Sequence, residues 1–144
     1  METKNLAQHE NAIETKPMGG YKVENVVLIE STFSRSPSID LNDFTISPEL
    51  NISHAAHETT SENKFGVTLT LDYKGKQNEI IICSAKITML GVFEKIGEPQ
   101  LGEEGFKKVN APAIIYPFIR EHLHNICLKA GIANVFLPTV NFKV

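Results

Sequence analysis

The strongest structural signal in this chain is a run of alternating apolar and polar residues over Phe65–Tyr73. Its odd positions carry large apolar side chains, and its even positions carry glycine, threonine or aspartate. A period of two in a segment rich in β-branched and aromatic residues is typical of a strand with one buried face. Turn-forming residues follow at Lys74–Asn78, and Glu79–Glu94 is a second apolar-rich run. The sequence therefore predicts a β-hairpin.

Two more strands and one helix are expected around this hairpin. Alternation over Tyr21–Ser34 predicts a long first strand, and a weaker pattern over Glu49–Ala56 predicts a second, with a crossing loop over residues 40–48. Gly97–Lys108 is predicted to be a solvated loop. Beyond it, apolar residues recur at helical spacing, from a proline at position 117 that suits a first turn to a glycine at position 131 that suits a C-cap.

Length and composition restrict the class of protein. The 144 residues suit one folded domain over residues 21–144, preceded by a flexible, mixed polar tail over residues 1–20. The formal net charge is −3, whereas nucleic-acid binders usually carry a basic patch, so we expect no nucleic-acid partner. No apolar run could span a bilayer or form a signal-peptide core. Cys83 and Cys127 lie in apolar stretches that suit a reducing compartment, so we expect a cytoplasmic protein without direct membrane insertion.

No residue pattern supports a catalytic or metal site. His54 and His57 are three residues apart, not the four that a zinc-protease helix requires, and a strand end is predicted there. His122 and His124 are two apart on the predicted helix and point in different directions. Cys127 is a candidate nucleophile beside one of these histidines, but its place on the apolar stripe favours a buried thiol. We therefore expect no enzyme activity, no metal and no cofactor.

The predicted sheet carries more apolar surface than a monomer with one solvated face requires. Neither side of the run Glu79–Glu94 is convincingly polar. Excess exposed apolar area marks an interface or a binding groove. Burial between identical subunits would explain it, and so would a surface that receives apolar segments of other proteins.

Residues 110–142 resemble the signature of the SecB family of protein-export chaperones. The shared pattern is a proline, an apolar pair, an aromatic-proline-aromatic triplet, Arg-Glu at a helix start, a glycine, and an ending similar to Leu-x-Pro-x-Asn-Phe. In this chain it falls on Pro112, Ile114, Ile115, Tyr116, Pro117, Phe118, Arg120, Glu121, Gly131, Leu137, Pro138, Val140, Asn141 and Phe142. The strands expected before it also follow the order of the family.

Members of this family form a four-stranded antiparallel sheet with helices on one side, an α+β fold, and assemble as dimers of dimers. The resemblance implies a chaperone that works without ATP, holds unfolded preproteins in apolar grooves, keeps them competent for translocation and delivers them to the SecA motor. It also implies a homotetramer, or at least a homodimer. Because such a holdase accepts many sequences, apolar area and strand edges serve it better than a shaped pocket.

The resemblance assigns residues to three surfaces. The groove for clients would draw on Phe44, Leu69, Leu71, Val135, Phe136 and Leu137. The contacts between subunits would use Ala85, Ile87 and Met89. The side that faces SecA would include Glu30, Ser34 and Lys86.

Two differences from the family pattern bear on the partner. The chain is expected to lack the family's second long helix and its acidic, zinc-binding tail. Of the three SecA-facing positions, where the family has carboxylates, only Glu30 is acidic, and Lys86 reverses the charge. Because like charges across an interface lower affinity, the alternative to general export is a dedicated chaperone of one partner, such as the antitoxin of a toxin–antitoxin system.

Overall fold

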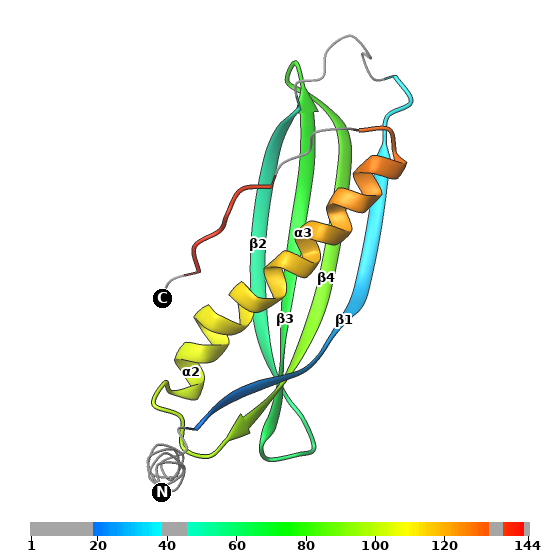
Figure 1. Cartoon of the computed structure of the whole chain (residues 1–144). Helices are drawn as coiled ribbons and strands as arrows, with labels where there is room; N and C mark the ends of the chain where they lie inside the picture. The colour runs from blue at the N-terminus through cyan, green and yellow to red at the C-terminus, as the bar shows by residue number, and fades with distance from the viewer. Residues whose placement is uncertain (1–18, 39–45, 133–136, 143–144) are drawn as a thin grey trace, which may run out of the picture.

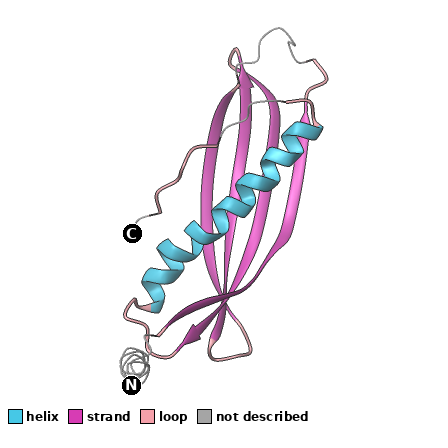
Figure 2. Ribbon diagram, viewed as in Figure 1, coloured by secondary structure: helices cyan, strands magenta, loops and turns pink. Residues whose placement is uncertain are grey.

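The chain forms one antiparallel sheet with a helical stretch after it (Figure 1). The structure is a computed structural model that describes residues 19–38, 46–132 and 137–142. The strands are β1 (Gly20–Arg35), β2 (Ser47–Glu58), β3 (Lys64–Gln77) and β4 (Ile80–Ile96), in the sheet order β1-β4-β3-β2. The helical stretch comprises α2 (Glu103–Gly105), the π-helical turn η1 (Phe106–Asn110) and α3 (Ala111–Lys129). The predicted fold class, a four-stranded antiparallel sheet with a helix on one side, is confirmed (Figure 2).

The turn between β3 and β4 is shorter than the sequence predicts. β3 continues through most of the expected turn to Gln77, and the chain reverses over Asn78 and Glu79 alone. Both residues have positive φ angles, 54° and 67°. Two left-handed residues in succession match the right-handed twist of the flanking strands, which is why two-residue hairpins prefer them. The predicted turn over Lys74–Asn78 therefore starts too early.

Helix α3 begins at Ala111 and not, as predicted, at Pro117. Pro112 occupies the first turn, where its missing N–H has no consequence, and Pro117 lies inside the helix. A proline inside a helix removes one backbone hydrogen bond, and the burial of the apolar stripe of the helix offsets this loss. The C-terminal end is as predicted, because Gly131 has a φ of 75° and follows the last turn.

Part of the predicted loop over Gly97–Lys108 is helical because a single aromatic residue anchors it. Phe106 is buried, and its ring centroid lies 4.0 Å from that of Tyr21, 5.9 Å from that of Phe65 and 5.2 Å from that of Phe93. The glycines and charges around this residue favoured a loop in the sequence. Its packing against the ends of β1, β3 and β4 overrides them.

The core lies between α3 and the sheet. Alternate apolar side chains of β3 and β4 face the helix, and one stripe of α3 faces them. The buried set from the strands includes Phe65, Val67, Leu69, Leu71, Tyr73, Ala85, Ile87, Met89 and Phe93. The buried set from the helix includes Ala111, Ile115, Ile119, Leu123 and Cys127. α3 runs diagonally across the sheet and packs mainly on β4 and β3 (Figure 1).

Gly91 on β4 allows α3 to approach the sheet closely. A Cβ at this position would lie 2.8 Å from Phe93 Cε2 and 3.0 Å from Ile115 Cδ1. Gly91→Ala should therefore push the helix from the sheet and lower the free energy of unfolding by about 1–3 kcal/mol. Gly102→Ala is the control, because nothing lies within 4 Å of its added Cβ. Urea unfolding followed by circular dichroism measures both variants, and an unchanged midpoint for Gly91→Ala would contradict this packing.

Some predictions fall outside the described residues. These are the tail over residues 1–18 and most of the loop over residues 40–48. The division of the chain at residue 20 stays a prediction. Within the part of the chain that the structure covers, no helix is long and apolar enough to cross a membrane.

Candidate functional site

The helix-covered face of the sheet holds residues from two of the three predicted functional sets. β3 and β4 pair so that Leu69 lies opposite Met89 and Leu71 lies opposite Ile87, with Ala85 next on the same side. Residues directly opposite each other in an antiparallel pair share one face of the sheet. The predicted groove residues and the predicted subunit contacts thus form a single surface, and this surface lies under α3.

Burial within the chain corrects the assignment of Ala85, Ile87 and Met89 to contacts between subunits. Their exposed fractions are 7, 0 and 9%. The apolar pattern of β4 predicted a face that one helix would leave partly open, whereas α3, which is 19 residues long, covers these positions. Leu69 and Leu71 are equally buried, so they form the floor beneath the helix and not an accessible wall for clients.

An extended segment, residues 137–142, packs beside α3 on the β2 side (Figure 1). Leu137 is buried in the core, and its assignment to the client groove stays a prediction. The Tyr116 hydroxyl donates a hydrogen bond to the Pro138 carbonyl oxygen at 2.7 Å, and the rings of Tyr116 and Phe142 are 6.0 Å apart. The other predicted groove residues lie outside the described residues: Phe44, Val135 and Phe136.

The opposite side of α3, which faces β1, carries an exposed apolar surface. Val23 and Leu28 lie on the helix side of β1 and are 42 and 47% exposed. Phe118 is 50% exposed and lies one turn before His122 on α3, so it shares the side of the helix that faces β1. Ser31 Oγ and His122 Nε2 are 2.8 Å apart and connect the two elements within this surface. We call Val23, Leu28 and Phe118 the apolar flank. Such a surface along an edge strand is typical of a protein interface.

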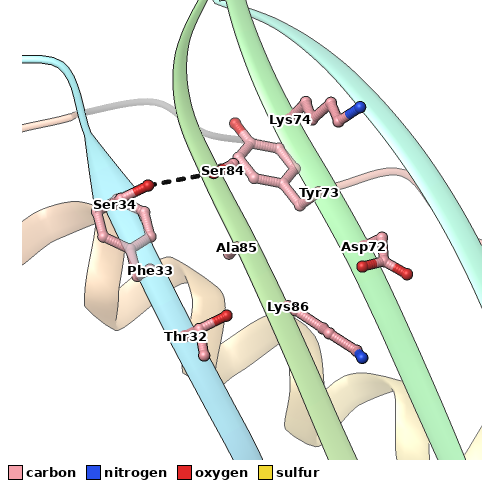
Figure 3. A pocket seen from close by; sticks show the side chains of 9 residues that line it. All are labelled: Thr32, Phe33, Ser34, Asp72, Tyr73, Lys74, Ser84, Ala85 and Lys86. Atoms are coloured by element: carbon pink, nitrogen blue, oxygen red, sulfur yellow. Dashed lines mark hydrogen bonds between the residues drawn. The ribbon is translucent and has the colours of Figure 1, made fainter.

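The open face of the sheet, opposite α3, brings together the three residues predicted to face SecA. Glu30 and Ser34 lie on β1, and Lys86 lies on β4 with its Nζ 3.6 Å from Glu30 Oε1. Ser34 Oγ is 3.2 Å from Ser84 Oγ, and Lys86 is directly opposite Asp72 on β3. A hollow of about 250 Å³ opens between these strands (Figure 3). The geometry thus places Lys86 between two carboxylates.

Further pairs of opposite charge connect the strands. Lys64 Nζ is 3.6 Å from Glu24 Oε1, and Lys76 Nζ is 2.7 Å from Glu49 Oε2. The hydrogen bond from Lys76 lowers the pKa of the Glu49 carboxyl group. These pairs are exposed and stabilise the fold little. Together with Lys86, they give the sheet a mixed pattern of charge.

The histidine and cysteine candidates do not come together in a reactive centre. His54 and His57 lie on opposite faces of β2, because residues three apart on a strand point in opposite directions. His57 Nε2 is 2.9 Å from Thr68 Oγ1 on the open face. Cys127 is 1% exposed, and burial raises the pKa of its thiol to about 11, with nearby Cys83 adding to the rise. Among the described residues, no three histidine, cysteine, aspartate or glutamate side chains are placed to hold a metal.

Both cysteine thiols should react slowly in the folded protein. A rise in the pKa of Cys127 from 9.0 to about 11 lowers its thiolate fraction near neutral pH about 100-fold, and burial also blocks the reagent. Ellman's reagent should label Cys83 and Cys127 at least about 100-fold more slowly in native protein than in guanidinium. Rapid labelling of native Cys127 would contradict its place in the core and restore it as a candidate nucleophile.

Tyr116 and Phe118 shape these surfaces, yet the sequence marked neither as a site residue. Phe118 lies off the helical stripe of Ile115, Ile119 and Leu123, and an aromatic side chain outside the stripe is a signal for a second contact. The hydrogen bond of Tyr116 had no such signal, because its partner is 22 residues away in the chain.

Comparison with known proteins finds relatives over most of the chain. The family described as "Preprotein translocase subunit SecB" matches residues 28–144. "Protein-export protein SecB" of Halorhodospira halophila is 30% identical over 87 residues, which are 60% of this chain and 50% of that protein. "Protein-export protein SecB 1" of Francisella tularensis subsp. novicida is 24% identical over 124 residues, which are 85% of this chain and 83% of that protein. The chain thus spans half the length of the first relative and most of the second.

A solved structure shares the fold. It is that of the Mycobacterium tuberculosis Rv1957 SecB-like chaperone in complex with a ChAD peptide from the Rv1956 HigA1 antitoxin. The TM-score is 0.67 at 11% sequence identity, and the likeness covers 97% of this chain and 99% of that chain. At this identity the comparison establishes the arrangement of sheet and helix.

Proposed function

This chain belongs to the SecB family of preprotein translocase subunits, and on that basis we propose that it is an ATP-independent holdase in the cytoplasm. It binds unfolded preproteins and keeps them competent for export. The family match over residues 28–144 carries the proposal, and it confirms the family that residues 110–142 had indicated.

An apolar surface at edge strand β2 supports this proposal. β2 lies beside the segment of residues 137–142, and its Leu50 and Ile52 are only half-buried against the core. Burial of apolar area contributes about 25 cal/mol per Å² whatever the sequence of the client. The outer backbone groups of an edge strand also bind extended chains without regard to side chains. Both contacts suit a protein that must hold many different unfolded segments.

We propose that the chain assembles as a homodimer or homotetramer through the apolar flank. The apolar flank replaces Ala85, Ile87 and Met89 as the proposed contact between subunits, because the side chains of these three residues are buried within the chain. An apolar surface that continues from an edge strand onto a helix is self-complementary in a two-fold dimer, where each copy covers the other. The assembly removes the flank from solvent and leaves the β2 side for clients.

A dedicated chaperone of one partner, such as an antitoxin, is the second candidate. Two observations favour it: the solved SecB-like chaperone with the same fold binds a peptide of an antitoxin, and the open face here has mixed charge. A pull-down from cells separates the candidates. Recovery of many unrelated precursor proteins would support general export, whereas recovery of a single partner would support the dedicated role.

Binding of SecA, which we include as a candidate partner, should respond to the charge at position 86. Lys86→Glu would place a third carboxylate beside Glu30 and Asp72 and should strengthen binding several-fold, by about 1 kcal/mol at low salt. Lys129→Glu, at the end of α3, is the matched control away from the open face. A fluorescence titration with purified SecA measures both affinities. An equal change in the two variants would show that the open face is not the contact.

Co-elution tests the holdase proposal itself. A precursor protein unfolded in guanidinium and diluted into nucleotide-free buffer should elute with this protein on size exclusion. The same precursor in its folded state should elute alone. Separate elution of the unfolded precursor would contradict the proposed function.

A further inference from the structure

The segment of residues 137–142 has the properties of a bound client. It is extended and carries no charged side chain. Leu137 is buried and Val140 and Phe142 are half-buried against the core, whereas Thr139 and Asn141 point to solvent. An extended apolar chain lying on an apolar surface is the form in which an unfolded polypeptide would bind there.

Few directional contacts hold this segment in place. Among the described residues, no hydrogen bond between backbone groups joins residues 137–142 to the rest of the chain. The bond from the Tyr116 hydroxyl to the Pro138 carbonyl oxygen is a side-chain contact with a backbone acceptor. Every polypeptide offers such a carbonyl at every residue. The contacts of this segment are therefore of a kind that a different sequence can reproduce.

The surface around the segment is apolar and is not covered by α3. Leu50 and Ile52 of β2 are half-buried and lie on the helix side of the sheet, opposite Tyr73 and Leu71 of β3. Tyr116 comes from the flank of α3, where the Arg120 guanidinium lies 5.7 Å from its ring centroid. An apolar floor with one hydroxyl donor at its side fits an extended segment of low charge.

We propose that residues 137–142 are an internal ligand of the client surface, which an extended apolar segment of an unfolded protein displaces. The inference rests on the proposed function in that the chain must bind unfolded segments. On displacement, the client covers the surface beside Leu50 and Ile52, and the Tyr116 hydroxyl donates to a client carbonyl instead of that of Pro138. The internal ligand lowers the apparent affinity for every client, because the surface is free for only a fraction of the time.

A single tryptophan reports the displacement, since the chain contains no tryptophan of its own. Phe142→Trp places the reporter on the segment, and Leu128→Trp, on the exposed side of α3, is the control. The probe is a synthetic, tryptophan-free, unfolded peptide rich in leucine and valine, with a dye whose anisotropy measures binding independently. On binding, emission from Trp at position 142 should shift to the red and become accessible to iodide, whereas emission from position 128 should not change.

The three outcomes separate this inference from the proposed function. Peptide binding with the red shift supports both. Binding without any change at position 142 overturns the internal ligand and leaves the holdase proposal standing. Absence of peptide binding overturns both.

A second pair of variants tests competition directly. Val140→Asp should weaken the packing of the segment and tighten peptide binding about tenfold, since the surface is then vacant more of the time. Thr139→Asp adds the same charge one residue away on the solvent side and should leave the affinity unchanged. Weaker binding by Val140→Asp would show that the segment is a wall of the client site and would overturn the inference.

Discussion

Replacement of Ile87 by aspartate should unfold the chain. Ile87 is fully buried on β4 under α3, opposite Leu71. The variant would lose the burial of a large apolar side chain and would bury a carboxylate among the apolar side chains beneath α3. Together these effects should lower the free energy of unfolding by more than about 5 kcal/mol, which is comparable with the whole stability of many domains.

Ile81→Asp is the matched control for this substitution. It changes the same residue type on the same strand, but Ile81 is 48% exposed, so its carboxylate stays in water. Its free energy of unfolding should fall by less than about 1 kcal/mol. Circular dichroism and urea unfolding compare the two variants. If the Ile87→Asp variant were folded and its assembly had a smaller mass than that of the wild type, Ile87 would again be assigned to a contact between subunits.

Charges in the apolar flank should split the proposed assembly. The double substitution Leu28→Asp and Phe118→Asp changes residues that are half-exposed in the single chain, so the fold should persist. In an assembly each carboxylate would be buried without a partner, and the dissociation constant should rise at least about 100-fold. Light scattering at micromolar concentration should give a multiple of 16.0 kDa for the wild type and 16.0 kDa for the variant.

Leu101→Asp is the control for the flank. Leu101 is exposed to a similar extent, at 44%, but lies in the connection before α2. The assembly of the Leu101→Asp variant should have the same mass as that of the wild type. A monomeric wild type, or a double variant that keeps the wild-type mass, would rule out the apolar flank as the interface.

The strands were predictable because burial on one face leaves a period of two in the sequence. This signal is strong in Phe65–Tyr73, where alternate residues are buried, and it placed β1 and β2 to within a few residues. Helix α3 was harder to delimit, because Pro112 and Pro117 both suit a first turn. Only the packing of the stripe that starts at Ala111 selects the first of them.

The functional surfaces were less predictable, because a sequence shows which residues are apolar but not which element covers them. Ile87 and Leu28 are both apolar strand residues on the helix side of the sheet, yet one is fully buried and the other is 47% exposed. The difference arises from the position of each strand, since α3 packs mainly over central β4 and touches edge strand β1 much less. The contact between Tyr116 and Pro138 likewise depends on the path of the chain after the helix.

The three residues assigned to the side that faces SecA share one face of the sheet. Glu30, Ser34 and Lys86 were named from family resemblance, and the register of β1 and β4 brings them to one face. The sequence did not indicate Asp72, which lies on β3 directly opposite Lys86 of β4. Their role toward a partner stays a prediction that the SecA titration tests.

The aggregation of a denatured precursor protein tests the central claim, that this chain holds unfolded clients without nucleotide. The precursor is unfolded in guanidinium and diluted into buffer that contains no ATP, and light scattering follows its aggregation. With this protein present at an equal concentration of subunits, scattering should be suppressed, and the effect should not increase on addition of ATP. Aggregation at the same rate with and without this protein would contradict the account.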